Sequence, residues 1–382
     1  MSMDFRRSWM DEDLELFRDN VVRFIETEMV PHDEEARKTG NVGHAIWRKA
    51  GELGLLGVDV PEEYGGAGGD FRHEAIIHEE MSRRALSGMS IGVHSIVAHY
   101  FLNHGTEAQK RHYLPKLVRG ELVGAIAMTE PGAGSDLQGV RTRADKADGG
   151  YRINGSKTFI SNGYLAGVVL VVAKTDPNQG AKGTSILIVD TADCAGFRVG
   201  RVLDKMGLKA QDTSELFFDD VRVGADAVLG GQEGQGFFQL MGDLPYERLI
   251  IGVAALAAME GAFTATLDYV RERKAFGKPI AEFQNTKFKL AEIATQIKVG
   301  RAFIDRCVED LVAGQLDTAT ASMAKLWGSE AQGRVVDECV QLFGGYGYMN
   351  EYLVTRMYTD ARIQRIFGGT SEIMKEVISR AL

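Results

Sequence analysis

The chain has few cysteines and no excess of basic residues. Among its 382 residues only three are cysteine, Cys194, Cys307 and Cys339, and no two of them form a CxxC pair. This spacing argues against a thiolate metal site and fits a reducing compartment. The formal net charge of −9 excludes the broad basic face that a general nucleic-acid binder needs.

The sequence also lacks obvious targeting and spanning segments. No uninterrupted apolar run reaches the ~18 residues that cross a bilayer, and residues 1–24 carry acidic side chains without an apolar signal core. We therefore expect no membrane span and a cytoplasmic location. The histidine pairs lie five residues apart, not the four that would place both rings on one helical face, so no metal site is predicted.

What is present divides into three zones. Residues 11–120 show apolar side chains at helical spacing, with breaks at Pro31, Gly40, 61–69 and Gly105. Short β-rich runs follow at 123–128, 168–173, 185–189, 197–202 and 215–218, separated by turns that include 148–150 and 154–155. Helical patterns then return at 249–262, 283–311, 319–342 and 371–382, the first preceded by Asp243 as the N-cap and Pro245 in the first turn.

This pattern predicts a mainly α protein with a central β module. We place the domains at 1–121 (helical), 122–232 (β) and 233–382 (helical). At 382 residues the chain exceeds the size at which a single hydrophobic core usually stops growing, which agrees with more than one domain.

Three glycine-rich segments carry the functional signal. Residues 126–136 read as a loop after a short strand, where glycines let backbone N–H groups approach a ligand and Thr129 and Ser135 add hydroxyls. Residues 341–348 and 366–374 place glycines between helices, where free N–H groups could meet phosphate or carbonyl oxygen. Taken singly, each segment could equally be a surface turn or a helix C-cap.

Together these segments resemble the acyl-CoA dehydrogenase family over essentially the whole chain. The resemblance rests on AMTEPGAGSD at 127–136, NGSKTFISNG at 154–163, MGLKAQDT at 206–213, RKAFG at 273–277, and the segments 341–360 and 368–370. LPYERL at 244–249 and GTSEIMKE at 369–376 are most similar to the long-chain branch. The resemblance implies a helical N-terminal domain, a middle β-barrel or sandwich and a C-terminal four-helix bundle.

The family resemblance also implies a reaction. It would be FAD-dependent α,β-dehydrogenation of a medium-chain, long-chain or branched acyl-CoA to the trans-2-enoyl-CoA, as in fatty acid β-oxidation. Electrons would pass to an electron-transfer flavoprotein, and the chain would form a homotetramer. An acyl-CoA oxidase, a flavin monooxygenase relative and a non-enzymatic acyl-CoA binding protein are the alternatives; the long C-terminal extension of many oxidases is not seen here.

By the same resemblance, individual residues receive roles. Those expected to contact FAD are Ile126, Met128, Thr129, Gly134, Ser135, Phe159, Ile160, Ser161, Thr370 and Glu372. Those expected to reach the FAD of a neighbouring subunit are Arg273, Phe276, Gln284, Gln341, Gly344 and Gly345. Those expected to contact the substrate are Ser135, Tyr246, Arg248 and Gly369. For Arg248 taken alone, a surface salt bridge would be the default role.

The catalytic base departs from the commonest family pattern. Many members carry Glu just before the terminal Gly-Thr, where this chain has Gly368. The long-chain and isovaleryl branches instead place the base before an Arg in the first bundle helix, where Glu247 stands. Glu247 borders an almost wholly apolar helix, and desolvation would make its carboxylate a stronger base. Gly368 would keep one role, since only its backbone N–H would bind the thioester oxygen. The alternative to a catalytic role is that Glu247 is an acidic residue at the N-terminus of a helix, where the helix macrodipole favours negative charge.

Overall fold

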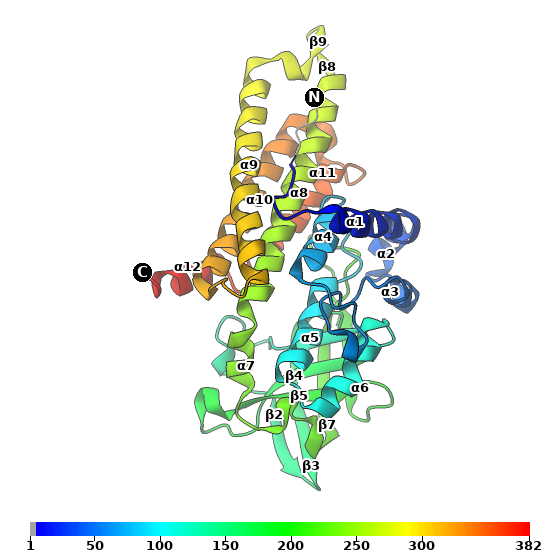
Figure 1. Cartoon of the computed structure of the whole chain (residues 1–382), viewed down its shortest axis with the longest axis vertical. Helices are drawn as coiled ribbons and strands as arrows, with labels where there is room; N and C mark the ends of the chain where they lie inside the picture. Colours follow the sequence, from blue (N-terminus) through cyan, green and yellow to red (C-terminus); the bar gives the residue numbers. More distant parts are fainter. Residues whose placement is uncertain (1–4) are drawn as a thin grey trace.

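The computed structural model describes residues 5–382, which form three consecutive parts (Figure 1). The first part is helical, with α1 (Glu12–Phe24), α2 (Asp33–Thr39), α3 (Gly43–Glu52), α4 (Phe71–Ser82), α5 (Ile91–His104) and α6 (Glu107–Val118). Gly40 ends α2 in the left-handed conformation with φ of 79°, as predicted from the sequence. Pro31 lies in η2 (Val30–His32), which together with η1 (Ile25–Met29) separates α1 from α2. The predicted break is therefore a change of helix type and not a chain reversal.

The middle part is one curled sheet of seven strands within the described residues. The strands are β1 (Gly124–Ala127), β2 (Arg143–Ala147), β3 (Gly150–Ser161), β4 (Val168–Lys174), β5 (Thr184–Asp190), β6 (Phe197–Val202) and β7 (Thr213–Gly224). Their order is β1-β4-β2-β3-β7-β6, with β5 paired to β4. β4 is buried along its whole length because alternate residues face two different hydrophobic clusters, one of them shared with α5 and α6.

One of the two predicted turns is wrong. Asp148 and Gly149 have φ of 45° and 81°, and they form the tight hairpin between β2 and β3. Asn154 and Gly155 instead lie inside β3, where the pairing with β7 shifts register. The Asn154 side chain accepts the backbone N–H of Asp220 at 2.9 Å, so the Asn-Gly pair makes a β-bulge and not a chain reversal.

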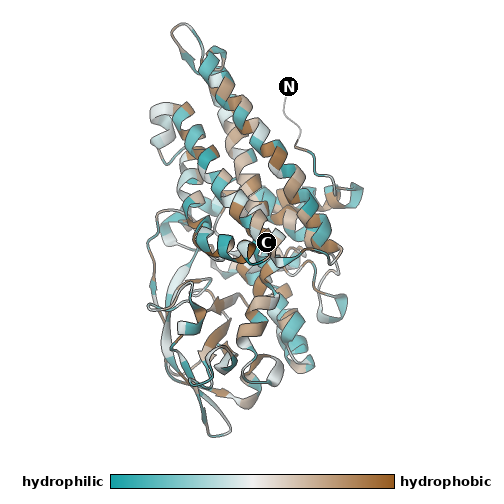
Figure 2. Ribbon diagram, turned by 90° about the vertical axis from the view of Figure 1, so that its left-hand side faces the viewer, coloured by the Kyte–Doolittle hydropathy of each residue, from teal (hydrophilic) through white to brown (hydrophobic). Residues whose placement is uncertain are grey.

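The last part is a helical bundle. Its elements are α7 (Gly236–Gly242), α8 (Leu244–Glu272), the hairpin of β8 (Lys274–Ala275) and β9 (Lys278–Pro279), α9 (Gln284–Val312), α10 (Thr318–Phe343), α11 (Leu353–Gln364) and α12 (Ser371–Ser379). α8 packs against α9, α10 and α11, and also against α4 of the first part. Figure 2 shows hydrophobic residues along these long helices and on the inner strands of the sheet. α11 was not predicted from the sequence.

Short 3₁₀ segments connect several of these elements. They are η3 (Glu62–Tyr64), η4 (Leu137–Gly139), η5 (Gly180–Gly183), η6 (Ala225–Ala227), η7 (Leu229–Gly231), η8 (Ile280–Glu282) and η9 (Gly344–Tyr348). The last of them carries the glycines of the second glycine-rich segment, directly after α10.

The search for an uninterrupted apolar run in the sequence did not single out α8. Among the described helices, α8 is long and apolar enough to cross a membrane by length and composition, although Glu247, Arg248 and Glu260 interrupt the run. In this structure 72% of its most apolar window is buried against other parts of the chain. The apolar composition of α8 is thus accounted for by its place at the centre of the bundle.

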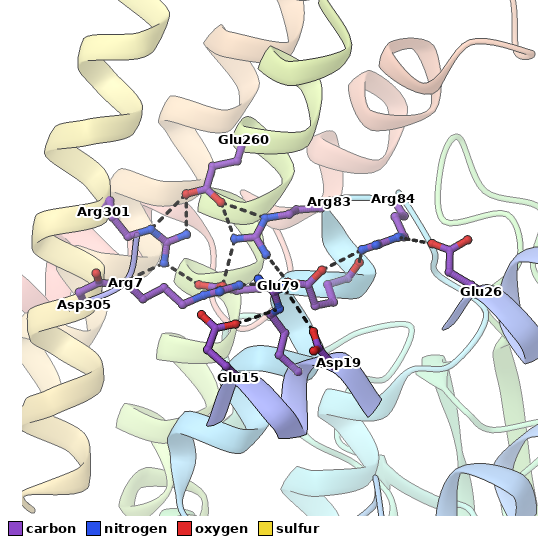
Figure 3. Close-up of polar contacts among 12 residues, drawn as sticks. Arg7, Glu15, Asp19, Glu26, Glu79, Arg83, Arg84, Glu260, Arg301 and Asp305 are labelled. Atoms are coloured by element: carbon purple, nitrogen blue, oxygen red, sulfur yellow. Dashed lines mark hydrogen bonds and ion pairs between the residues drawn. The ribbon is translucent and has the colours of Figure 1, made fainter. Parts of the chain in front are cut away.

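A buried ion-pair network joins the first part to the bundle (Figure 3). Arg301 on α9 contacts Glu79 on α4 and Glu260 on α8, each at 2.6 Å. Arg83, just after α4, also contacts Glu260, and Arg7 contacts Glu79. Because each carboxylate meets at least two guanidinium groups, the network fixes α4 against α8 and α9.

Candidate active site

The buried Lys157 anchors the glycine-rich loop of the segment 126–136, which follows β1. Lys157 on β3 is 1% exposed, and its ammonium donates to the Met128 carbonyl at 3.0 Å and to Glu130 Oε1 at 2.8 Å. Burial lowers the pKa of Lys157 to about 8, and the charge of Glu130 opposes that shift. The Glu130 carboxylate also accepts the N–H groups of Arg141 and Thr142. These contacts fix both ends of the loop.

The middle of the same loop faces open space. A Cβ added to Gly132 or Gly134 would have no atom within 4 Å, and Ser135 is exposed. The Thr129 carbonyl accepts the N–H of Thr158 at 2.9 Å, which joins the loop to β3. Room, backbone N–H groups and hydroxyls therefore occur together in this loop, as a polar cofactor requires.

An aromatic ring stands exposed where β3 is irregular. Phe159 is 68% exposed, and its φ of 60° lies in the left-handed region that bulky residues rarely adopt. The register of β3 against β7 shifts between Lys157 and Ile160, and this irregularity surrounds Phe159. The Ile160 side chain is buried in the sheet core, so only its backbone can reach a ligand. A strained, exposed ring beside an open loop fits the face of a planar group.

Three further predicted cofactor residues border this surface. Ser161 ends β3 and accepts a hydrogen bond from Gln211 Nε2 at 3.2 Å, and Gln211 also bonds the Ser90 hydroxyl. Ile126 and Met128 are half-buried and pack on the cluster beneath β1. The structure thus brings together the predicted cofactor residues of segments 126–135 and 159–161.

Glu247 lies in the first turn of α8, half-buried between helices. The Tyr100 hydroxyl on α5 donates to Glu247 Oε1 at 3.1 Å. Burial raises the pKa of the Glu247 carboxyl to about 7 and the negative charge of Asp243 adds to the rise, whereas the hydrogen bond from Tyr100 opposes it. At neutral pH the group can therefore both lose and take up a proton, which a general base requires.

Asp243 does not cap α8 with its side chain, contrary to the sequence prediction. Its carboxylate instead accepts from Asn103 Nδ2 at 2.6 Å and lies 2.8 Å from His104 Nε2, both on α5. The Asp243 carboxylate is thus occupied by side chains of the facing helix α5 and does not reach the first N–H groups of its own helix.

The structure buries two residues predicted to contact the substrate. Tyr246 is 8% exposed, stacks on His99 at 3.9 Å between ring centroids, and donates to Asp59 at 3.3 Å. Arg248 is 4% exposed and donates to Ser322 Oγ at 2.8 Å, so it is not a surface salt-bridge residue. Within residues 5–382 its Nε has no hydrogen-bond partner.

The terminal glycines approach α8 close to Glu247. Gly368 has φ of 61°, and a Cβ added there would lie 2.5 Å from Ile251 Cδ1, one helical turn after Glu247. The fully buried Lys325 on α10 donates to the carbonyl of Gly369. Burial and the charge of Arg248 lower the pKa of Lys325 to about 8. The loop is therefore anchored while Gly368 itself is exposed.

Thr370 and Glu372 occupy the start of α12. The Thr370 hydroxyl accepts the N–H of Ile373 at 3.3 Å as the N-cap, and Glu372 is exposed in the first turn. A hydrogen bond from the backbone of Glu372 itself, followed by one from the Thr370 side chain, lowers the pKa of Glu372. Both residues thus lie next to Gly368 and Gly369.

The remaining predicted cofactor residues lie in a separate hollow of about 800 Å³ at the far end of the bundle. Arg273, Phe276, Gln341, Gly344 and Gly345 line it, and Gln284 follows the lining residue Phe283. Phe276 is 96% exposed. A Cβ added to either glycine would meet no atom within 4 Å. This hollow also has room for a bound group.

The two regions cannot meet within one chain. Glu247 lies in the first turn of α8 and Arg273 follows its last residue, so at 1.5 Å per residue they are roughly 39 Å apart. Figure 1 shows the β8 and β9 hairpin and the sheet at opposite ends of the molecule. The sequence did not point to Tyr100, Gln211 or Lys325, whose partners lie far away along the chain.

Comparison with known proteins agrees with this arrangement. The chain matches the models of the acyl-CoA dehydrogenase N-terminal domain over residues 11–121, the middle domain over 125–221 and the C-terminal domain over 234–382. It is 50% identical over 371 residues to the mitochondrial long-chain specific acyl-CoA dehydrogenase of Sus scrofa, covering 96% of this chain and 86% of the relative.

Solved structures show the same similarity. An acyl-CoA dehydrogenase from Geobacillus kaustophilus superposes with a TM-score of 0.95 at 45% identity, over 98% of this chain and 99% of the other. A glutaryl-CoA dehydrogenase from Mycobacterium smegmatis in complex with FADH2 gives a TM-score of 0.89 at 29% identity, over 97% and 95%. These matches confirm the resemblance and the fold predicted from the sequence. The chain belongs to the acyl-CoA dehydrogenase family of FAD-dependent oxidoreductases.

Proposed function

We propose that this protein dehydrogenates the α,β bond of a medium-chain, long-chain or branched acyl-CoA, with Glu247 as the base. One observation carries the proposal. Glu247 is a half-buried carboxyl group whose pKa is raised to about 7. It lies one helical turn before Ile251, and Ile251 is the residue that a Cβ at Gly368 would contact. Gly368, where many relatives carry their base, and Glu247, the proposed base of this chain, therefore lie next to the same part of the pocket.

In the proposed reaction Glu247 removes the proton from the α-carbon of the thioester. The N–H of Gly368 binds the thioester oxygen, where negative charge develops as the proton leaves. FAD, when bound, supplies the acceptor for the hydride that leaves the β-carbon. The Tyr100 hydroxyl donates to the carboxylate of Glu247, and Lys325 holds the terminal loop in place.

The residues present fit FAD at two places. The loop at 128–135 and the segment 159–161 would hold the ring system, with Phe159 against its face and the hydroxyls of Thr129 and Ser161 at its edge. The hollow around Arg273, with its cationic guanidinium and open glycines, would receive the other end of a cofactor bound to another subunit. A separation of roughly 39 Å within one chain supports a homo-oligomer, which we take to be a tetramer.

The buried position of Arg248 alters its expected role. A cation that is 4% exposed and next to Glu247 in sequence does not reach out to a solvated CoA phosphate. We assign it to the thioester side of the pocket, close to Glu247 and Lys325. Contact with the CoA moiety then falls to the exposed Ser135.

We further propose that electrons pass to an electron-transfer flavoprotein. The cytoplasmic location expected from the sequence stays a prediction, since the Sus scrofa relative is named as mitochondrial.

The reaction and its substrate class can be tested with a panel of acyl-CoA thioesters, short to long and straight or branched. Each thioester is mixed anaerobically with the FAD-loaded protein. Bleaching of the flavin absorbance is the expected result. Rapid peroxide formation in air would indicate an oxidase, and failure to bind FAD would indicate a non-enzymatic binding protein.

A further inference from the structure

Two helices meet at Glu247 through matched sets of polar side chains. Asp243 and Glu247 lie one turn apart at the start of α8, and Tyr100, Asn103 and His104 lie one turn apart at the end of α5. Residues at this spacing share a helical face. Tyr100 contacts Glu247, and the other two contact Asp243, so each carboxylate of α8 has its own donors on α5.

The contact from Tyr100 is a dedicated one. Its side chain is 0% exposed, and its hydroxyl lies 3.1 Å from Glu247 Oε1. A phenol hydroxyl that cannot reach water strengthens its bond to a carboxylate when that carboxylate is ionised. The same bond limits rotation of the Glu247 side chain, whose carboxylate must face the α-carbon to within about 1 Å.

We propose that Tyr100 is a positioning residue for Glu247: its buried hydroxyl favours the ionised carboxylate and orients it toward the α-carbon, while Asp243 one turn away acts in the opposite sense on the charge. This inference rests on the proposed role of Glu247 as the base. Tyr100 and Asp243 together set the pH range in which Glu247 is ionised and able to accept a proton, and neither of them touches the substrate.

The groups that face Glu247 come from the two helices. Tyr100 and His99 on α5 and Arg248 on α8 favour the ionised carboxylate, and Asp243 opposes it. Burial is the largest effect and also opposes ionisation. Removal of the Tyr100 hydroxyl therefore raises the pKa of Glu247 further above its ordinary value, and removal of the Asp243 charge lowers it.

Tyr100→Phe and Asp243→Asn are the test variants, because both keep side-chain shape. The rate of flavin bleaching by an acyl-CoA is measured anaerobically from about pH 5 to about pH 9. Tyr100→Phe is expected to move the acidic midpoint up by roughly one pH unit, which lowers the rate about tenfold below the midpoint. Asp243→Asn is expected to move the midpoint down.

Tyr113→Phe is the matched control. Tyr113 on α6 also donates to a carboxylate, that of Asp190 at 3.1 Å, but its partner is on β5 and not at α8. This variant loses one tyrosine-to-aspartate hydrogen bond and should leave the midpoint unchanged. General loss of stability would affect both tyrosine variants, whereas opposite shifts for Tyr100→Phe and Asp243→Asn require a change at the base itself.

A second readout avoids activity altogether. Infrared difference spectra recorded during a pH titration follow the carboxyl C=O band that disappears in Glu247→Gln. Its midpoint should rise in Tyr100→Phe. If Tyr100→Phe leaves both midpoints unchanged while Glu247→Gln abolishes bleaching, the inference is overturned and the proposed function stands. If Glu247→Gln bleaches normally, the proposed base itself is wrong.

Discussion

The buried network around Arg301 gives a prediction about stability that does not depend on the reaction. Arg301→Met keeps most of the side-chain length but removes the guanidinium, which is 4% exposed. Its nitrogen atoms contact Glu260 at 2.6 and 3.1 Å, Glu79 at 2.6 Å and Asp305 at 3.1 Å. The substitution leaves three buried carboxylates with one cation fewer.

The size of the effect follows from which partners remain. Glu79 keeps Arg7 and Arg83, and Glu260 keeps Arg83, so the lost hydrogen bonds do not simply add. Breaking a buried ion pair from one side costs about 3–5 kcal/mol, and we expect a loss of unfolding free energy in this range.

Arg306→Met is the matched control. Arg306 lies on the same helix, pairs with Asp310 at 2.8 Å, and has a side chain that is 67% exposed. Removing such a surface pair costs about 0–1 kcal/mol. Urea titrations at one protein concentration, followed by tryptophan fluorescence, measure both variants. A loss for Arg301→Met within about 1 kcal/mol of the loss for Arg306→Met would refute the reasoning.

The same network has a pH dependence with a defined sign. Burial alone would raise the pKa of Glu79, but Arg301, Arg7 and Arg83 outweigh it and lower the pKa well below its ordinary value. A carboxyl with a lowered pKa stabilises the folded state above its unfolded-state pKa, and this contribution is lost as the pH falls through the folded-state value. The stability advantage of the wild type over Arg301→Met should therefore shrink in acid.

Three further predictions concern the two candidate binding regions. Gly368→Ala should slow flavin bleaching, since a Cβ at φ of 61° would press on Ile251 Cδ1 at 2.5 Å; adding Ile251→Ala should recover part of the rate. Lys325→Met should lower the unfolding free energy by about 1–3 kcal/mol, because the terminal loop loses the donor to its carbonyl. Arg273→Ala should lower the ratio of FAD to protein after gel filtration, whereas Arg271→Ala, just outside the hollow, should not.

Much of the fold could be predicted from local patterns. The strand at Phe197–Val202 and the long helices were visible because apolar periodicity depends on neighbours within one element. The pair Asn154 and Gly155 misled for the same reason: the dipeptide favours a tight turn, and only the pairing of β3 with β7 turns it into a bulge. α11 was not predicted; it is a helix of 12 residues that follows the segment Gly344–Tyr348, whose glycines favour turns.

The candidate site was only half visible in the sequence. Glu247 could be proposed because it borders an apolar helix and because Gly368 lacks a carboxylate. Its contact with Tyr100 joins residues 147 positions apart and depends on how α5 packs against α8. The burial of Arg248 likewise follows from bundle packing; it excludes the surface salt bridge that was the default role, while the predicted contact with the substrate stays a prediction. Contacts between side chains on different helices can be identified only once the tertiary structure is known.

The central claim is that Glu247 is the base, and Glu247→Gln tests it most directly. Glutamine keeps the shape and can still accept the hydrogen bond from Tyr100, but it cannot take up the α-proton. With FAD content and fold matched to the wild type, a single anaerobic turnover with an acyl-CoA is followed by flavin absorbance. We predict that the first-order rate of bleaching falls by about 10²–10⁴-fold. A variant that bleaches at the wild-type rate would show that Glu247 is a helix-end acid and that the base lies elsewhere.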